Sequence, residues 1–325
     1  MKAILVNSDR SLSWSEVPNP EIKADEVLVE IHAAAINRAD LMQREGDYPP
    51  PPGCPEWMGL EVAGVITALG DEAKAHWNIG DRVCALLGGG GYAEQVAVRY
   101  DMLMPIPKNC SMEQAASIPE AFATGYLNLF YEGKYQEGNT LLVTAGGSGL
   151  ASVIIPMAKA FGARVITTVS SAKKAEKITH LGADVIVDLS SQDLAEVLKA
   201  EWEAGHGVDV AIDCLGGEML GKCLHHLNYG ARWVVIAALR GQMVSIDLKN
   251  LYVKNVKLLG STLRSKPPAV KAQILSELVE KVYPKIESGE VMPTIDSVFP
   301  ITEAEAAQDL LYQNKNVGKV VLKVR

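Results

Sequence analysis

Residues 140–150 read TLLVTAGGSGL, an apolar run that passes directly into a glycine-rich turn. The segment after the turn is apolar and has a helical composition, so the order is strand, glycine turn, helix. This order is typical of dinucleotide-binding sites. Glycines such as Gly146, Gly147 and Gly149 let the backbone approach a pyrophosphate, whose charge the free N–H groups at the helix start stabilise. We therefore expect residues 146–149 to bind a dinucleotide.

A glycine cluster alone also fits an ordinary strand–helix turn, but five more apolar runs follow it, separated by stretches with a helical pattern. The six predicted strands are Thr140–Thr144, Arg164–Val169, Asp184–Asp188, Val208–Asp213, Arg232–Ala237 and Val256–Gly260. Strands that alternate with amphipathic helices form βαβ units on a parallel sheet. The sequence therefore predicts an α/β fold with a doubly wound parallel sheet of the Rossmann type over residues 119–262.

The first 118 residues have a different sequence pattern, with short strand-like segments separated by Gly and Pro. The predicted strands here are Glu26–Ile36, Val62–Leu69, Asp81–Leu87 and Tyr92–Val98. Residues 46–53, GDYPPPPG, can form only an exposed loop, because proline supplies no backbone donor. A long amphipathic helix is expected over Ala269–Ser288 and a closing strand over residues 316–324. At 325 residues the chain exceeds a single core of about 250 residues. We expect a mostly β domain of residues 1–118, completed by 263–325, beside the domain of residues 119–262.

Composition narrows the classes of function. Hydrophobic residues make up 48% and charged residues 22%, as in ordinary globular proteins. The formal net charge is -8, and no Lys/Arg-rich segment is present, so nucleic acid is not an expected partner. No apolar run reaches the roughly 18 residues needed to span a bilayer, and the apolar start is too short for a signal peptide. We therefore expect a cytoplasmic protein that does not enter membranes.

The five cysteines are widely spread, without a C-x-x-C pair or a histidine at metal-ligand spacing. We expect reduced structural thiols and no metal site.

The end of the second predicted Rossmann strand favours NADPH over NADH. Residues 169–174 read VSSAKK, with no carboxylate to hold the ribose 2′-hydroxyl of NAD. A serine and lysines would instead favour a 2′-phosphate. We expect Lys173 and Lys177 only to solvate a helix face.

Six short motifs carry a family resemblance that runs nearly end to end. They are NRADLMQR at 37–44, YPPPPG at 48–53, LMPIP at 103–107, IPEA at 118–121, DCLGG at 213–217 and NKNVGK at 314–319. With these motifs the chain resembles the zinc-independent quinone oxidoreductases of the medium-chain dehydrogenase/reductase superfamily, and most of all their tumour-suppressor-inducible subgroup. The resemblance implies a GroES-like, mostly β catalytic domain, a Rossmann domain, NADPH in a cleft between them, and a homodimer joined through the Rossmann sheets.

The resemblance also implies roles for single residues. Tyr48 and Thr124 would flank the nicotinamide. The pyrophosphate turn would be formed by Ser148, Gly149 and Leu150, the 2′-phosphate site by Ser171 and Lys174, and a further cofactor contact by Asn316. One departure weakens the NADPH expectation, because the subgroup commonly has a tyrosine at the position of Leu189. Zinc-dependent relatives have Gly-His-Glu where this chain has Gly59-Leu60-Glu61, and leucine cannot ligate a metal.

The expected activity is hydride transfer from NADPH to a quinone or a similar electrophile held near Asn37, Asp40 and Tyr48. Asn37 could donate to a substrate carbonyl, or it could cap a loop by bonding to Asp40; both interpretations stay open. Tyr48 is expected to form a pocket wall, because a phenol is a weak acid at neutral pH. One alternative is reduction of an enal, enone or enoyl thioester. Another, of a different class, is a protein that senses NADPH or binds RNA without turnover.

Overall fold

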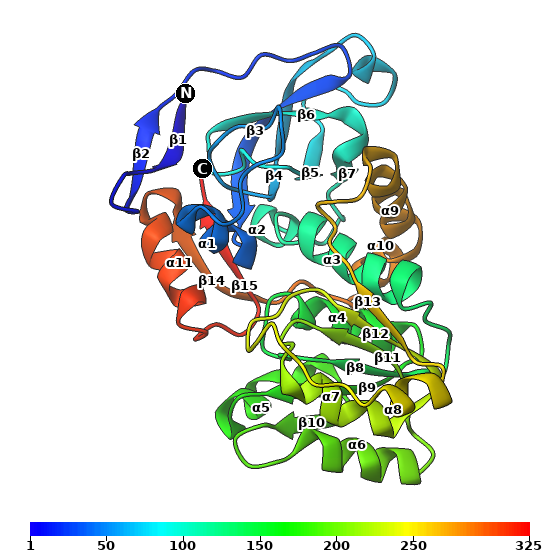
Figure 1. Cartoon of the computed structure of the whole chain (residues 1–325). Coiled ribbons are helices and arrows are strands. Elements are labelled where there is room, and N and C mark those ends of the chain that lie inside the picture. The colour runs from blue at the N-terminus through cyan, green and yellow to red at the C-terminus, as the bar shows by residue number, and fades with distance from the viewer. The chain divides into compact units, whose positions relative to one another are not determined.

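The computed structural model describes all residues 1–325, and the chain divides into two compact units. We call the first unit the β lobe; it comprises Met1–Ala123, Lys266–Gly289 and Pro293–Arg325. The second unit, the Rossmann lobe, comprises Thr124–Ser265 and Glu290–Met292. Figure 1 shows that both chain termini belong to the β lobe.

The β lobe is built on a seven-stranded sheet. Its strand order is β14-β15-β3-β4-β5-β7, and β6 pairs with β3 off this path. The strands are β3 (Glu26–Ala35), β4 (Glu61–Leu69), β5 (Arg82–Leu86), β6 (Gln95–Arg99), β7 (Leu103–Pro105), β14 (Ile295–Pro300) and β15 (Lys319–Lys323), and β1 (Lys2–Val6) and β2 (Leu12–Glu16) form a separate hairpin. The helices are α1 (Arg38–Glu45), α2 (Met112–Ala115), α3 (Pro119–Tyr126), α9 (Pro268–Lys281), α10 (Tyr283–Glu287) and α11 (Ala304–Tyr312). The last residues of α3 belong to the Rossmann lobe.

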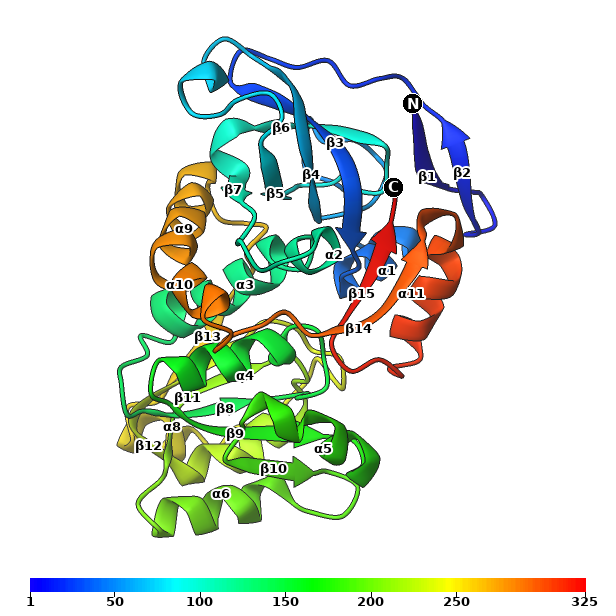
Figure 2. The ribbon, with the colours of Figure 1, turned by 180° about the vertical axis from the view of Figure 1, so that it is seen from behind.

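Strand β3 organises this sheet, because it pairs with β4, β6 and β15. Its side chains alternate between partly and fully buried along most of its length, as expected for a strand with one face on the core. Strand β15 comes from the C-terminal end of the chain and runs antiparallel to β3. The ends of β3, β4 and β15 are thus brought together although they are distant in sequence (Figure 2).

The Rossmann lobe has a six-stranded, fully parallel sheet in the order β10-β9-β8-β11-β12-β13. The strands are β8 (Thr140–Val143), β9 (Arg164–Val169), β10 (Val185–Asp188), β11 (Val208–Asp213), β12 (Leu227–Val235) and β13 (Lys257–Gly260). All six predicted strands are confirmed, and β12 begins five residues earlier than expected, at Leu227 rather than Arg232. This order is that of the doubly wound dinucleotide fold, with its switch point between β8 and β11.

Helices cover both faces of this sheet: α7 lies over one face in Figure 1, and α4 lies over the other in Figure 2. The helices are α4 (Ala151–Ala160), α5 (Ala172–Ile178), α6 (Leu194–Glu203), α7 (Glu218–Cys223) and α8 (Leu248–Val253), and a π-helical segment spans Leu127–Glu132. Leu198 of α6 and Cys223 of α7 pack with Trp233 of β12 in one buried cluster. Each of the five cysteines is a free thiol.

The prediction of one helix over residues 269–288 is wrong in detail. Helix α9 ends at Lys281, and α10 begins at Tyr283 after a break at Val282. Pro284 explains the break, because it has no N–H for the helical ladder and its ring crowds the carbonyl four residues earlier. None of the helices combines the length and the apolar character needed to cross a bilayer.

Candidate functional site

The predicted glycine turn joins β8 to α4 in the Rossmann lobe. Ala145 takes a left-handed conformation with a φ of 57°, and the N–H of Gly146 donates to the Thr168 carbonyl at 2.7 Å. A side chain at Gly146 would collide with the Thr167 Oγ1 atom, 2.5 Å from an added Cβ. The turn therefore needs a glycine here so that it can lie against β9.

The start of α4 leaves backbone donors unused by the protein. The Ser148 hydroxyl accepts from the N–H of Ala151 at 3.1 Å, whereas the N–H groups of Gly147, Gly149 and Leu150 donate to no protein acceptor. Free N–H groups and the helix dipole together favour an anion at such a terminus. The residues present thus fit the pyrophosphate of a dinucleotide.

A buried carboxylate supports this turn from the neighbouring strand. Asp213, at the end of β11, is 0% exposed and accepts from the Thr144 hydroxyl at 3.0 Å and from the Trp233 indole at 3.1 Å. It also accepts from the N–H groups of Leu215 and Gly216. Asp213 therefore connects β8, β11 and β12 at the switch point, where nucleotides bind in folds of this type.

Ser171 and Lys174, which we predicted to hold a 2′-phosphate, follow the end of β9. Ser171 caps α5 by accepting from the N–H of Lys174 at 3.4 Å, so both residues lie in the first turn of this helix. Lys174 is partly buried, whereas Lys173 and Lys177 are exposed. Leu189 follows β10 and packs at the edge of the apolar core, so it offers no polar group to an adenosine phosphate.

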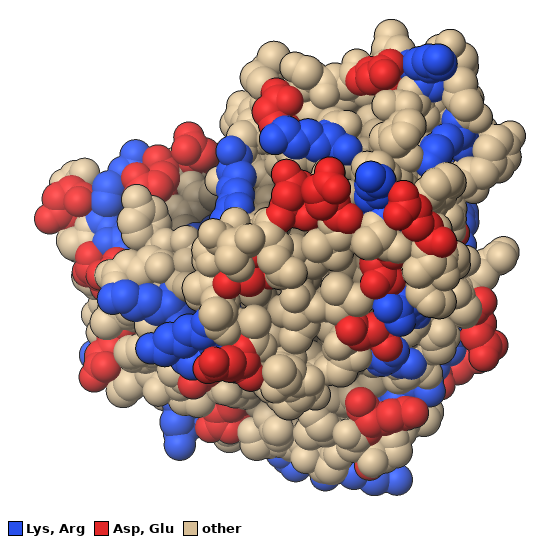
Figure 3. Space-filling view, turned by 90° about the horizontal axis from the view of Figure 1, so that it is seen from below, with Lys and Arg blue, Asp and Glu red and all other residues tan.

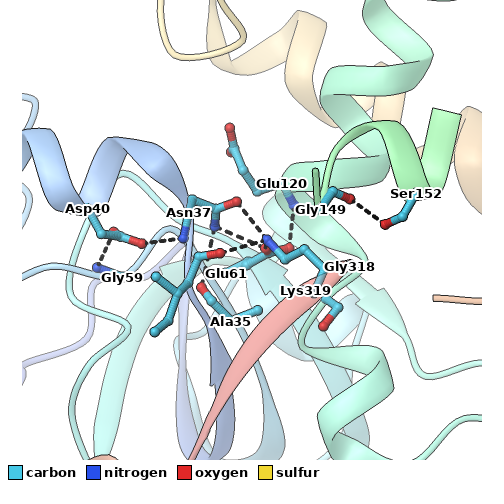
Figure 4. Close-up of polar contacts among 12 residues, drawn as sticks. Ala35, Asn37, Asp40, Gly59, Glu61, Glu120, Gly149, Ser152, Gly318 and Lys319 are labelled. Atoms are coloured by element: carbon cyan, nitrogen blue, oxygen red, sulfur yellow. Dashed lines mark hydrogen bonds and ion pairs between the residues drawn. The ribbon is translucent and has the colours of Figure 1, made fainter. Parts of the chain in front are cut away.

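A second polar cluster lies in the β lobe, where β3, β4 and β15 meet (Figure 4). Its centre is Lys319, which is 3% exposed. The Lys319 Nζ atom donates to the Ile36 carbonyl at 3.0 Å, to Asn37 Oδ1 at 2.7 Å and to Glu61 Oε1 at 2.7 Å. All three ammonium hydrogens thus have acceptors, as a buried charge requires.

Glu61 connects Lys319 to the start of α3. Its Oε1 atom also accepts from Asn37 Nδ2 at 3.0 Å, and its Oε2 atom accepts from the backbone N–H of Glu120 at 2.9 Å. Glu61 itself is 0% exposed. One carboxylate therefore holds two separate chain segments in place.

Asp40 is the third buried acid of this cluster, and it is 0% exposed. Its Oδ2 atom accepts from the Asn37 N–H at 2.7 Å and from the Tyr92 hydroxyl at 3.0 Å, and its Oδ1 atom accepts from the Gly59 N–H at 3.2 Å. Burial raises the pKa of Asp40 to about 6, although these hydrogen bonds and the charge of Lys319 act in the opposite direction.

The structure brings Asn37 and Asp40 together, as expected from their spacing. The two hydrogens of the Asn37 amide are directed to Glu61 Oε1 and, at 3.3 Å, to the Ala35 carbonyl. Asp40 is sealed from solvent. These contacts favour the capping interpretation over direct donation to a substrate, and the catalytic roles of Asn37 and Asp40 stay predictions.

The other predicted contacts are distributed over both lobes. Tyr48 lies partly buried in the proline-rich loop of the β lobe, and Thr124 is the first residue of the Rossmann lobe. Asn316 is 4% exposed, and its amide donates to the Gly318 carbonyl at 2.8 Å, so part of its bonding capacity is used within the tail. The cofactor roles of these three residues stay predictions.

Sequence reasoning missed Glu61, Lys319, Glu120 and Asp213 as functional candidates. Three of them lie within motifs quoted for the family resemblance: Lys319 in NKNVGK, Glu120 in IPEA and Asp213 in DCLGG. A charged residue inside a predicted apolar strand, as in Gly318-Lys319-Val320-Val321, was the available signal. No group of three or more His, Cys, Asp or Glu side chains in the chain could hold a metal ion.

Comparisons with known proteins agree with this architecture. Residues 23–108 match the alcohol dehydrogenase GroES-like domain, and residues 149–280 match the zinc-binding dehydrogenase family model. The quinone oxidoreductase-like protein 2 homolog of Nematostella vectensis is 31% identical over 306 residues, which cover 92% of this chain and 82% of that protein. The chain belongs to the quinone oxidoreductase family of the medium-chain dehydrogenase/reductase superfamily.

Solved structures of this superfamily match over the full length. The quinone oxidoreductase of Thermus thermophilus, determined alone and with NADPH, has a TM-score of 0.84 and 29% identity, and the match covers 100% of both chains. The CurK enoyl reductase has a TM-score of 0.84 and 26% identity, and the match covers 100% of this chain and 99% of that one. The chain therefore has the pyridine-nucleotide-binding fold of an oxidoreductase, with the predicted pairing of a GroES-like domain and a Rossmann sheet.

The raised pKa of Asp40 leads to a prediction about stability. Because the folded-state pKa of about 6 exceeds the ordinary value of 3.8, protonation favours the folded state, and stability should fall as pH rises from about 4 to about 6. The unfolding free energy of the wild type minus that of Asp40→Asn should decrease by about 2 kcal/mol from pH 4 to pH 7 in urea titrations. Asp71→Asn is the control. Asp71 is exposed and the hydrogen bond from Lys74 lowers its pKa, so the same difference for this variant should not decrease over this pH range. A pH-independent difference for Asp40→Asn would contradict the assignment.

Proposed function

We propose that this chain is an NADPH-dependent quinone oxidoreductase. The observation that carries the proposal is the set of unused N–H groups at Gly147, Gly149 and Leu150, which lie at the switch point of a six-stranded parallel sheet. These groups would hold the cofactor pyrophosphate, with Ser171 and Lys174 at the 2′-phosphate. When bound, NADPH supplies the hydride. The family resemblance adds Tyr48 and Thr124 beside the nicotinamide.

The polar cluster of the β lobe supports a quinone as acceptor. Lys319 is the only cation among Lys319, Asn37 and Asp40, and it is paired with Glu61 and bonded to Asn37, so the cluster offers little positive charge to polarise a substrate carbonyl. An unactivated ketone would need such polarisation. A quinone is already electron-poor and needs mainly proximity and orientation. Asn37 and Asp40 therefore act by shaping the acceptor site near Tyr48.

The nearest alternative is a reductase of enones or enoyl thioesters, and the similarity to the CurK enoyl reductase favours it as the second candidate. An NADPH-sensing or RNA-binding protein without turnover has less support. On the face drawn in Figure 3, Lys and Arg alternate with Asp and Glu, and no basic patch forms. With a net charge of -8, such a surface does not attract a phosphate backbone.

We expect NADPH to be oxidised rapidly with quinones and slowly with enones, and NADH to be the poorer donor. Lys174→Glu should raise the KM for NADPH at least 10-fold without raising that for NADH, because a carboxylate repels the 2′-phosphate. Lys177→Glu, on the exposed side of the same helix, is the matched control and should have little effect. Fast enone turnover without quinone turnover would reverse the choice of acceptor. An unchanged KM in Lys174→Glu would refute the phosphate site.

We also propose a homodimer formed through the β13 edge of the Rossmann sheet. Strand β13 pairs only with β12, and the segment before it exposes large apolar side chains: Leu239, Met243, Leu248, Tyr252 and Val253. An open strand edge beside an exposed apolar patch is typical of an association surface. Sedimentation velocity should show a dimer for wild type and a monomer for Tyr252→Asp. Tyr312→Asp, at an equally exposed tyrosine of α11, should remain dimeric. A wild-type monomer would exclude this interface.

A further inference from the structure

We infer that Glu120 is the acid that protonates the reduced acceptor. The inference rests on the proposed function, because it names the proton donor of that same reaction. Glu120 is the second residue of α3, directly after Pro119, in the β lobe.

The backbone position of Glu120 is set by the buried cluster. Its N–H donates to Glu61 Oε2 at 2.9 Å, and the other oxygen of Glu61 accepts from the side chain of Asn37 at 3.0 Å. Glu120 and Asn37 thus attach to opposite oxygens of one rigidly held carboxylate. Because we expect the acceptor near Asn37, this arrangement fixes the backbone of Glu120 within one shared carboxylate of the expected acceptor site.

Solvent access distinguishes Glu120 from the other acids of the cluster. Asp40 and Glu61 are both 0% exposed, so neither can contact an acceptor or recover a proton directly from water. Residue Glu120 as a whole is partly exposed. Figure 4 shows it directed away from the Glu61–Lys319 pair. A proton donor needs both properties, since it must reach the substrate and then be reprotonated.

Burial and the charged groups around Glu120 leave about half of its carboxyl groups protonated at pH 7. Burial raises its pKa to about 7, and the negative charges of Glu61 on β4 and Asp40 on α1 act in the same direction. Lys319 on β15 and Lys271 on α9 act in the opposite direction. A general acid is most effective when its pKa lies near the working pH.

The proton transfer follows hydride addition and conserves atoms and charge. Hydride addition to the quinone gives a hydroquinone monoanion, and the O–H bond of Glu120 breaks as its proton bonds to the anionic oxygen. Glu120 is left as a carboxylate, and a proton from water restores it. The acceptor thus gains one hydride and one proton, NADPH becomes NADP⁺, and Glu120 is unchanged after each cycle.

The decisive variant is Glu120→Gln, which keeps the shape of the side chain and removes its acidic proton. We expect kcat with a quinone to fall roughly 100-fold, while NADPH binding, measured by fluorescence titration, stays within about twofold. In the wild type, kcat should be constant below pH 7 and decrease above it, as Glu120 ionises with its pKa of about 7. In Glu120→Gln this decrease should be absent.

A second variant tests the same acid without altering it. Lys271→Met removes a positive charge that lowers the pKa of Glu120, so the midpoint of the kcat decrease should move to higher pH. Lys271→Arg keeps the charge and should leave the midpoint unchanged. Infrared difference spectra of the ligand-free protein, wild type minus Glu120→Gln, should show a protonated carboxyl band that titrates near pH 7, whether or not an acceptor is reduced.

Failure of the proposed function and failure of the Glu120 role give different results. A wild type that oxidises no NADPH with quinones overturns the proposed function. A wild type that does so, together with an equally active Glu120→Gln or an infrared band that is absent at pH 6, overturns only the role of Glu120. Loss of NADPH binding in Glu120→Gln would also overturn it, because the residue would then hold the cofactor rather than donate the proton.

Discussion

The buried ammonium group of Lys319 is the constraint on which the polar cluster of the β lobe depends. A charge that is 3% exposed is tolerated only when it is paired and fully hydrogen-bonded. Glu61, Asn37 and the Ile36 carbonyl supply its three acceptors. These groups belong to β4 and to the segment that joins β3 to α1, so satisfying one lysine fixes the relative positions of three parts of the β lobe.

The Lys319–Glu61 pair also affects the pKa values of the neighbouring carboxyl groups. One buried ammonium can neutralise only one carboxylate, and Glu61 takes that place at 2.7 Å. Asp40 and Glu120 are both influenced by the charge of Lys319, but burial raises the pKa values of both. Asp40 is closed to solvent and works through the backbone of Asn37 and Gly59. Glu120 keeps partial exposure, which allows it to exchange protons.

Local sequence patterns predicted the Rossmann lobe well, because each of its strands and its glycine turn can be recognised from a few consecutive residues. Each parallel strand is a continuous apolar run, and the turn at Gly146 and Gly147 has a fixed position between strand and helix. Three predicted runs of the β lobe appear as β3, β4 and β5 with ends shifted by one residue. The break at Val282 was missed, because the apolar period continues through Pro284 although the backbone hydrogen bonds cannot.

The polar cluster of the β lobe could not be predicted in this way. Lys319 and Glu61 are 258 positions apart, and a lysine at the end of an apolar strand is normally interpreted as an exposed residue. The pairing of β15 with β3 and of β3 with β4 brings the two together. The most direct measurement is a double-mutant cycle of urea unfolding on Lys319→Met, Glu61→Gln and the double variant. We predict that each single change destabilises the protein by about 3–5 kcal/mol and that the double variant recovers most of the loss. Single variants as stable as the wild type, or additive losses in the double variant, would contradict the central role of this ion pair.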